Sequence, residues 1–234
     1  MHQQLFLLHF AGGNCYSYDF IKGSLKDFNL FVLELPGRGR RLNENLLKDF
    51  DLAAHDIYRQ LTQKLNSSPF FIYGHSMGAY LALRVSKMLE KSGTSPAYII
   101  VSGNAGPGIG DGKKRYLMNH EDFVGELRKL GGVPDELIEN QELFKYFDPI
   151  LRADFEITEK NELGNEPAVN VPLYAIMGSR EEKVDEISNW GRFTRSRFNY
   201  EVLEGDHFFI YKHPERIAGL IKECCSTVTF YQLY

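Results

Sequence analysis

Short apolar runs alternate with longer amphipathic stretches along most of the chain. The apolar runs are rich in Val, Ile, Leu, Phe and Tyr and end at glycine, proline or polar residues; they lie at residues 5–10, 30–35, 70–73, 98–102, 173–177 and 200–203. Helical periodicity occupies residues 52–65, 79–91, 185–197 and 214–224. Continuously apolar strands that alternate with helices are typical of βαβ units in a sheet covered on both faces. The pattern therefore predicts an α/β fold with a mostly parallel central sheet flanked by helices.

The region between the fourth and fifth predicted strands departs from this alternation. Residues 104–167 contain no convincing strand pattern, and they open with a glycine-rich run that is typical of a loop. Helical patterns follow at residues 121–130, 135–143 and 144–155. Their apolar side consists of Leu127, Leu130, Leu137, Ile138, Phe144, Phe147, Ile150 and Leu151. We interpret the segment as a helical insertion packed over one end of the sheet, because it is too long for an ordinary pair of crossover helices.

Composition and charge narrow the class of protein. The 234 residues are 43% hydrophobic, which is enough for one sizeable core, so we expect a single domain over residues 1–234 with the insertion inside it. Charged residues make up 25% of the chain and the formal net charge is -4, without the basic footprint of a nucleic-acid-binding protein. The longest apolar runs have the length of strands, so we expect no membrane span.

The cysteines and the first residues bear on the compartment. An odd number of cysteines with two adjacent, Cys15, Cys224 and Cys225, forms neither a disulfide framework nor a metal-ligand pattern. Reduced thiols are typical of the cytosol. Residues 1–10 lack the basic region, the full-length apolar region and the cleavage site of a signal peptide. We therefore expect a cytoplasmic protein with no metal site.

The strongest chemical signal lies at residues 74–78, Gly-His-Ser-Met-Gly, between the strand at residues 70–73 and the helix that starts at residue 79. A sharp strand-to-helix turn around Gly-x-Ser-x-Gly places the serine in a strained conformation, and side chains at Gly74 and Gly78 would collide with neighbouring backbone. The turn exposes the Ser76 hydroxyl above the sheet. It also places the Met77 N–H at a helix N-terminus, where it can face an oxyanion. We predict Ser76 as a nucleophile.

A serine nucleophile requires a base within hydrogen-bonding reach. His207 follows the last predicted strand, on a loop at the carboxyl end of the sheet, and it comes after the serine as α/β-hydrolase enzymes require. The remaining histidines precede the serine, lie beside it, or fall in helices or the insertion: His2, His9, His55, His75, His120 and His213. We predict His207 as the general base.

The acid that orients His207 should follow the strand at residues 173–177. Three carboxylates compete after that strand: Glu181, Glu182 and Asp185. We favour Glu181 because it comes first on the turn, and glutamate can fill this role.

A second oxyanion donor should come from the loop after the first strand, where Gly12 and Gly13 let the backbone approach a ligand closely. Ala11 is the preferred donor and Phe10 is the alternative.

Several motifs, in this order, resemble the type II thioesterases that accompany nonribosomal peptide and polyketide synthases, a family that also includes medium-chain acyl hydrolases of fatty-acid synthase. The motifs lie at residues 10–13 (Phe-Ala-Gly-Gly), 35–39 (Leu-Pro-Gly-Arg-Gly), 74–78, 130–134 (Leu-Gly-Gly-Val-Pro), 151–155 (Leu-Arg-Ala-Asp-Phe) and 205–209 (Gly-Asp-His-Phe-Phe). The family usually has aspartate where this chain has Glu181. Arg38, Arg152 and Asp154 fall in these motifs, and we interpret them as structural ion-pairing residues.

The resemblance implies an α/β-hydrolase fold with a helical lid, a serine–histidine–acid triad, and hydrolysis of acyl groups from the phosphopantetheine arms of acyl or peptidyl carrier proteins. It also implies a monomer with no cofactor of its own. The basic run at residues 113–115 is a candidate contact for an acidic carrier, although such runs are commonly just solvated surface. Two other functions share the same fold: a carboxylesterase or lipase that cleaves oxyesters, and a non-catalytic module that holds an acyl chain.

Overall fold

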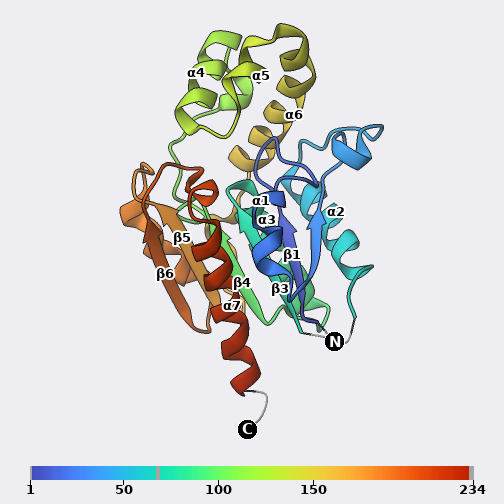
Figure 1. Ribbon diagram of the computed structural model, residues 1–234, viewed down its shortest axis with the longest axis vertical. Coiled ribbons are helices and arrows are strands. Elements are labelled where there is room, and N and C mark those ends of the chain that lie inside the picture. Colours follow the sequence, from blue (N-terminus) through green and yellow to red (C-terminus); the bar gives the residue numbers. More distant parts are fainter. Residues whose placement is uncertain (1, 67–68, 232–234) are drawn as a thin grey trace.

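The computed structural model describes residues 2–66 and 69–231, and its centre is a twisted sheet of six strands (Figure 1). The strands run in the order β2-β1-β3-β4-β5-β6, and every neighbouring pair of these six is parallel. Their bounds are Gln4–Leu8 (β1), Asn29–Leu33 (β2), Phe70–His75 (β3), Tyr98–Ser102 (β4), Leu173–Gly178 (β5) and Phe198–Leu203 (β6). The predicted parallel α/β sheet is confirmed, with strand ends shifted by up to two residues.

Each face of the sheet has its own hydrophobic core because successive side chains of a strand point to opposite faces. In β1, Phe6 and Leu8 join the core that α2 (Phe50–Thr62) and α3 (Met77–Lys91) cover. Leu5 and Leu7 join the core on the other face, which α1 (Asp19–Lys22) and α7 (Pro214–Tyr231) cover. This arrangement accounts for the continuously apolar strands in the sequence. The short helix α1 was not predicted.

The region predicted as a helix at residues 185–197 is instead a 3-10 helix, Val184–Phe193. Its three buried apolar side chains, Ile187, Trp190 and Phe193, are spaced three residues apart. Side chains at this spacing lie directly above one another at 3.0 residues per turn, whereas an α-helix would rotate them apart. The period of this segment is therefore 3.0, and the prediction of an α-helix here was wrong.

Three α-helices lie between β4 and β5, at the end of the molecule above the sheet (Figure 1): α4 (His120–Leu130), α5 (Asp135–Glu139) and α6 (Gln141–Glu159). They enclose a small core of their own that includes Phe123, Leu127, Ile138, Phe144 and Leu151. The predicted break between the second and third helices was placed at residue 143. In the structure the break is at Asn140, whose side chain accepts a hydrogen bond from the Leu143 N–H and so caps α6.

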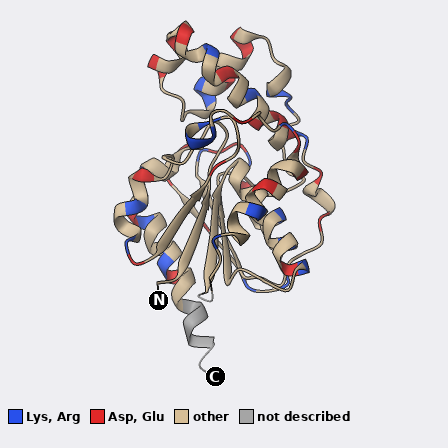
Figure 2. Cartoon of the chain, turned by 90° about the vertical axis from the view of Figure 1, so that its right-hand side faces the viewer, with Lys and Arg blue, Asp and Glu red and all other residues tan. Residues whose placement is uncertain are grey.

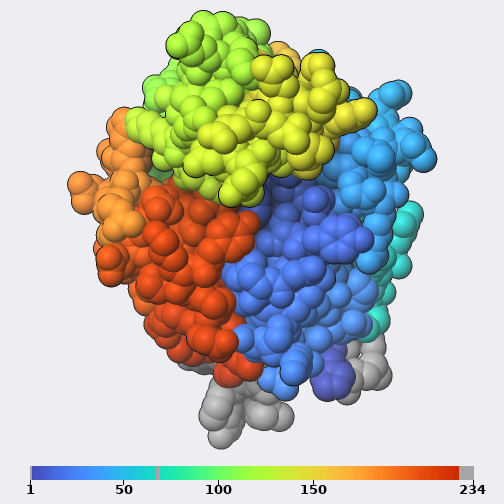
Figure 3. Space-filling view, turned by 45° about the horizontal axis from the view of Figure 1, so that its top comes forward, coloured from blue at the N-terminus to red at the C-terminus, as the bar shows by residue number. Residues whose placement is uncertain are grey.

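The helices α4, α5 and α6 cover the edge of the sheet where the strands end. Seen from this side, they lie over the line where the N-terminal and C-terminal segments of the chain meet (Figure 3). The order of the strands reverses between β1 and β3, and the carboxyl ends of such neighbouring strands are the usual place for a ligand in open α/β sheets. Among the helices that the structure describes, none is long and apolar enough to cross a membrane.

Candidate active site

The turn between β3 and α3 holds Ser76 in an unusual backbone conformation, with φ 55° and ψ -114°. A positive φ is strained for a residue other than glycine. The flanking glycines make the turn possible: a Cβ at Gly74 would lie 2.1 Å from the Gly78 carbonyl oxygen, and a Cβ at Gly78 would lie 2.2 Å from that of Leu8. Any side chain at either position would therefore force the turn to open and move Ser76.

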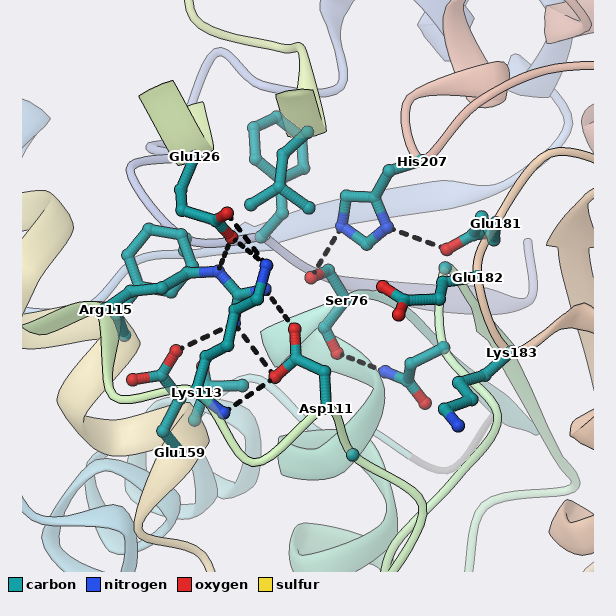
Figure 4. Close-up of a pocket in the computed structure, with 18 of the residues that line it drawn as sticks. Ser76, Asp111, Lys113, Arg115, Glu126, Glu159, Glu181, Glu182, Lys183 and His207 are labelled. Atoms are coloured by element: carbon teal, nitrogen blue, oxygen red, sulfur yellow. Dashed lines mark hydrogen bonds and ion pairs between the residues drawn. The ribbon is translucent and has the colours of Figure 1, made fainter. Parts of the chain in front are cut away.

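His207 lies within hydrogen-bonding distance of Ser76, with 2.9 Å between its Nε2 and the serine Oγ. Its other ring nitrogen, Nδ1, is 2.8 Å from Glu181 Oε2 (Figure 4). The second carboxylate oxygen of Glu181 accepts a hydrogen bond from the Gly178 N–H at 2.8 Å. The end of β5 therefore fixes the carboxylate, the carboxylate fixes the imidazole, and the imidazole faces the serine.

Glu181, and neither of the other two candidate acids, is the carboxylate that hydrogen-bonds to His207. Glu182 is exposed and lies 4.0 Å from Lys129, and Asp185 is also exposed. The additional methylene of glutamate, compared with the aspartate usual in the family, is accommodated because the Gly178 N–H draws the Glu181 carboxylate back toward the turn.

The two predicted oxyanion donors come from the start of α3 and from the loop after β1. Met77 is the first residue of α3, and an N–H in the first turn of a helix has no acceptor within that helix. Ala11 lines the same pocket as Ser76, as does Phe10. The loop after β1 closes on itself through a hydrogen bond of 2.9 Å from the Gly13 N–H to the Phe10 carbonyl oxygen.

His75 adds a second imidazole next to His207, and their ring centroids are 5.1 Å apart. Its Nδ1 is 2.8 Å from Ser102 Oγ, and its side chain is completely buried. Burial holds the pKa of His75 well below its usual value, and the positive charge that His207 would carry lowers it further. His75 is therefore neutral at neutral pH and brings no competing positive charge to the site.

Ser76, His207 and Glu181 line a pocket of about 590 Å³ between the sheet and the helices above it. Part of its wall is apolar and comes mostly from those helices: Tyr80, Leu127, Leu130, Leu151, Phe155 and Phe208. Another part of the wall is charged and is formed by residues of the glycine-rich loop and of α4 and α6 (Figure 4). The pocket can thus take a mostly apolar group whose reacting end lies at Ser76.

The basic run at residues 113–115 takes part in this charged wall. Lys113 Nζ lies 2.8 Å from Glu126, and the Arg115 guanidinium is nearly buried among carboxylates. Only Lys114 is exposed. The charges of Lys113 and Arg115 are thus already paired with carboxylates of this wall, and contact of the run with a carrier stays a prediction.

Two residues that hold the site in place were not predicted in that role. Asp154, on α6, forms a buried two-point ion pair with Arg38 and also accepts a hydrogen bond of 2.8 Å from the Gly12 N–H, next to Ala11. Asn104 donates its side-chain amide to the Ser76 carbonyl oxygen at 2.9 Å. The motif at residues 151–155 pointed to Asp154 as an ion-pairing residue, but no sequence signal connected it to the loop after β1.

A parallel sheet with this turn at the end of its central strand, followed in chain order by the acid and the histidine, defines the α/β-hydrolase class of enzymes. Within that class the chain belongs to the thioesterase family, since the model of the Thioesterase domain matches residues 3–225. The resemblance to type II thioesterases is confirmed by the comparisons with individual proteins.

The chain is similar to three proteins over nearly its whole length. It is 31% identical over 230 residues to the gramicidin S biosynthesis protein GrsT of Aneurinibacillus migulanus. The matched region covers 94% of this chain and 88% of that protein. It is 30% identical over 226 residues to a Brevibacillus parabrevis protein named linear gramicidin dehydrogenase LgrE, covering 93% and 86%. The structure of BorB, a type II thioesterase from the borrelidin biosynthetic cluster, superimposes with a TM-score of 0.85 at 29% identity, covering 96% and 93%.

Proposed function

We propose that the chain hydrolyses acyl thioesters carried on the phosphopantetheine arms of acyl or peptidyl carrier proteins, in editing or release during nonribosomal peptide, polyketide or fatty-acid biosynthesis. The observation that carries the proposal is the continuous hydrogen-bonded series Glu181–His207–Ser76 on the wall of an acyl-sized pocket. Membership of the thioesterase family supports thioesters as the substrate class. The biosynthetic relatives named above support a carrier protein as the partner.

The geometry supports the following catalytic roles. His207 Nε2 takes the proton of Ser76 as the serine oxygen attacks the thioester carbonyl carbon, while Glu181 holds the proton on Nδ1 and stabilises the imidazolium. The negatively charged oxygen is bound by the N–H groups of Met77 and Ala11. The carbon–sulfur bond then breaks, the sulfur takes the proton from His207 Nε2, and the thiol departs, which leaves His207 neutral. A thiol has a pKa of about 8.5, so it needs far less help from a proton donor than an amine does.

Water completes the reaction by hydrolysing the acyl-enzyme, with His207 again as the base. No step needs a metal or a cofactor of the chain itself.

We further propose that the chain works as a monomeric cytoplasmic enzyme with a single domain, in which residues 104–167 form a lid over the pocket. Its substrate arrives without contact with nucleic acid or membrane. Lys114 is the exposed cation of the loop within that segment and can meet an acidic carrier.

The test is hydrolysis of a carrier protein loaded with an acetyl or short acyl group, followed by intact mass spectrometry. The wild-type chain should remove the acyl mass, and Ser76→Ala should lose roughly five to six orders of magnitude in rate. Retention of the acyl group by both, with free oxyesters cleaved by the wild type, would support a carboxylesterase instead. If neither ester is cleaved and a serine-directed phosphonate does not label Ser76, the chain is a binding module rather than an enzyme.

A further inference from the structure

The loop after β1 contains a tight turn in which Ala11 is the second residue. The Gly13 N–H donates to the Phe10 carbonyl oxygen at 2.9 Å, and Gly12 has a φ of 77°. This hydrogen bond and a positive φ at the third residue are typical of a type II turn. The Gly12 N–H donates to Asp154 on α6, whereas the Ala11 N–H has no acceptor among the residues that the structure describes. The Ala11 N–H is therefore available to a ligand.

His9, which precedes this turn, makes a second hydrogen bond to the Phe10 carbonyl oxygen. Its Nδ1 lies 2.8 Å from that oxygen, and its Nε2 lies 3.3 Å from the nitrogen of Leu35 in the loop after β2. A carbonyl can only accept and a backbone N–H can only donate, so His9 has its proton on Nδ1. Both lone pairs of the Phe10 carbonyl oxygen are then occupied, one by the imidazole and one by the Gly13 N–H.

The surroundings of His9 keep its imidazole neutral. Charged residues lie mainly on the helices and loops, and the strands of the sheet are nearly free of them (Figure 2). His9 directly follows β1 and is buried. Burial lowers its pKa to about 4, and the nearby Arg38 charge acts in the same direction. The carboxylates of Asp154 and Glu34 oppose this change without reversing it, so the ring is neutral at neutral pH.

We infer that His9 is a positioning residue that aims the Ala11 N–H at the oxyanion. The peptide group between Phe10 and Ala11 is planar and trans, so its N–H lies in the plane of its C=O and points the opposite way. The two donors that hold the Phe10 carbonyl oxygen therefore also fix the direction of the Ala11 N–H. The inference rests on the proposed function, in which this N–H binds the oxygen of the reacting thioester.

The competing interpretation is that His9 only ties two loops together through the Leu35 N–H. The two interpretations depend on different nitrogens of the ring, Nδ1 for the Ala11 peptide and Nε2 for the loop after β2. Asparagine and glutamine separate them. The amide nitrogen of asparagine is as many bonds from Cβ as Nδ1, so His9→Asn keeps a donor for the Phe10 carbonyl. The amide oxygen of glutamine is as many bonds from Cβ as Nε2, so His9→Gln keeps an acceptor for Leu35.

The test compares the hydrolysis of one acyl-pantetheine thioester by the wild type, His9→Gln and His9→Asn. We expect kcat of His9→Gln to fall by about tenfold to a hundredfold, less than for the removal of a whole oxyanion donor, with KM within about twofold. His9→Asn should recover most of that loss, although it also lacks one of the two hydrogen bonds. The rates are measured well below the melting temperatures and are counted per serine labelled by a phosphonate, so that unfolded chains do not contribute.

A trifluoromethyl ketone analogue of the substrate gives a second measurement. Its carbonyl carbon takes the Ser76 oxygen, His207 takes the serine proton, and the resulting oxyanion meets the same N–H groups. Its inhibition constant should weaken in His9→Gln by the same factor as kcat/KM. The corresponding thioether, which has no carbonyl, should bind to the wild type and both variants alike, whereas a distorted pocket would weaken the binding of both analogues.

His55→Gln is the matched control, because His55 Nδ1 lies 2.7 Å from the Asp51 carbonyl oxygen but the residue is exposed on α2. It should keep the wild-type kcat and both inhibition constants. Equal kcat values for His9→Gln and His9→Asn would overturn the inference, as would a lower value for His9→Asn. If His9→Gln does not fold, His9→Asn decides alone, because a tenfold loss in it also overturns the inference. Absence of hydrolysis by the wild type would refute the proposed function and, with it, the role of His9.

Discussion

The turn that holds Ser76 and the helices that cover it are fixed by different kinds of contact. Around the turn the constraints are between backbone atoms of neighbouring strands and helices, such as the close approach of Gly78 to the Leu8 carbonyl. The helices α4 to α6 instead have a small core of their own. The helix α6 is joined to the rest of the molecule by Ile157, which belongs to the core under α2 and α3, and by the buried pair Arg38–Asp154, 116 residues apart in the chain.

Because of this difference, we expect substitutions in the two regions to have different effects: those at the turn should change the rate of catalysis, and those in the ion pair should change the stability of the fold. Backbone contacts at the turn leave little freedom, so substitutions of the side chains that it positions should change the rate far more than the stability. The pair Arg38–Asp154 carries no chemistry in the proposed mechanism, so its loss should act chiefly on stability. Three predictions test this division.

The largest effect should come from Glu181→Gln. A glutamine can donate its amide to His207 Nδ1 and so favour the tautomer that has its proton on Nε2, where it cannot accept the proton of Ser76. A change of this kind in a serine–histidine–acid triad lowers kcat by about 10⁴-fold. We expect a loss of that order in the hydrolysis of an acyl-carrier substrate, with little change in the unfolding midpoint.

Glu182→Gln is the control for this prediction, since Glu182 is the next residue and is exposed. Its rate should stay within about twofold of the wild type, as expected for a surface substitution. A large loss in Glu182→Gln together with a small loss in Glu181→Gln would show that the acid has been assigned to the wrong residue.

An intermediate effect is expected from Asp154→Asn. The substitution leaves the buried Arg38 guanidinium without its counter-charge, and the removal of one partner of a buried ion pair costs about 3 to 5 kcal/mol. For a chain of this length that corresponds to a fall in Tm of roughly 10 °C. Urea unfolding and thermal melting of Asp154→Asn and the wild type both measure this loss of stability.

Two further variants sharpen the prediction for Asp154. Asp148→Asn removes a partly exposed ion pair with Arg152 on the same helix and should cost no more than about 1 kcal/mol. The double variant Arg38→Met with Asp154→Leu removes both buried charges and should regain much of the lost stability. A double variant no more stable than Asp154→Asn would show that the hydrogen bond from the Gly12 N–H, which asparagine can still accept and leucine cannot, is worth about as much as the unpaired guanidinium costs.

The same division explains how far the sequence could predict the structure. The strands and the Ser76 turn follow from local pattern, because apolar runs and paired glycines act within a few residues. The pattern alone could not separate Glu181 from Glu182, and the choice depended on order along the turn. Contacts between residues far apart in the chain, such as the hydrogen bond from the Gly12 N–H to Asp154, leave no periodic signal in one sequence. The 3-10 helix at Val184–Phe193 was missed because apolar residues three positions apart also occur on one side of an α-helix, so three of them within ten residues do not distinguish the two kinds of helix.

The smallest effect concerns His9, which joins the loop after β1 to the loop after β2. Its Nδ1 lies 2.8 Å from the Phe10 carbonyl oxygen, and its Nε2 accepts from the Leu35 N–H at 3.3 Å. Burial lowers the pKa of His9 to about 4, and the nearby Arg38 charge acts in the same direction. The folded chain therefore keeps His9 neutral where the unfolded chain, with a pKa near 6.5, already binds a proton.

It follows that the stability due to neutral His9 is complete above about pH 6.5 and is lost as the pH falls toward 4. One pKa unit corresponds to about 1.4 kcal/mol, so the loss between pH 6.5 and pH 5 should be about 2 kcal/mol. Buried His75 acts in the same direction, so only the difference between the wild type and His9→Gln isolates His9. Urea unfolding of both across this window should show a shallower pH dependence for His9→Gln. Two curves separated by a constant amount would mean that His9 takes up its proton in the folded chain as readily as in the unfolded one, and that these loops are not held by a neutral imidazole.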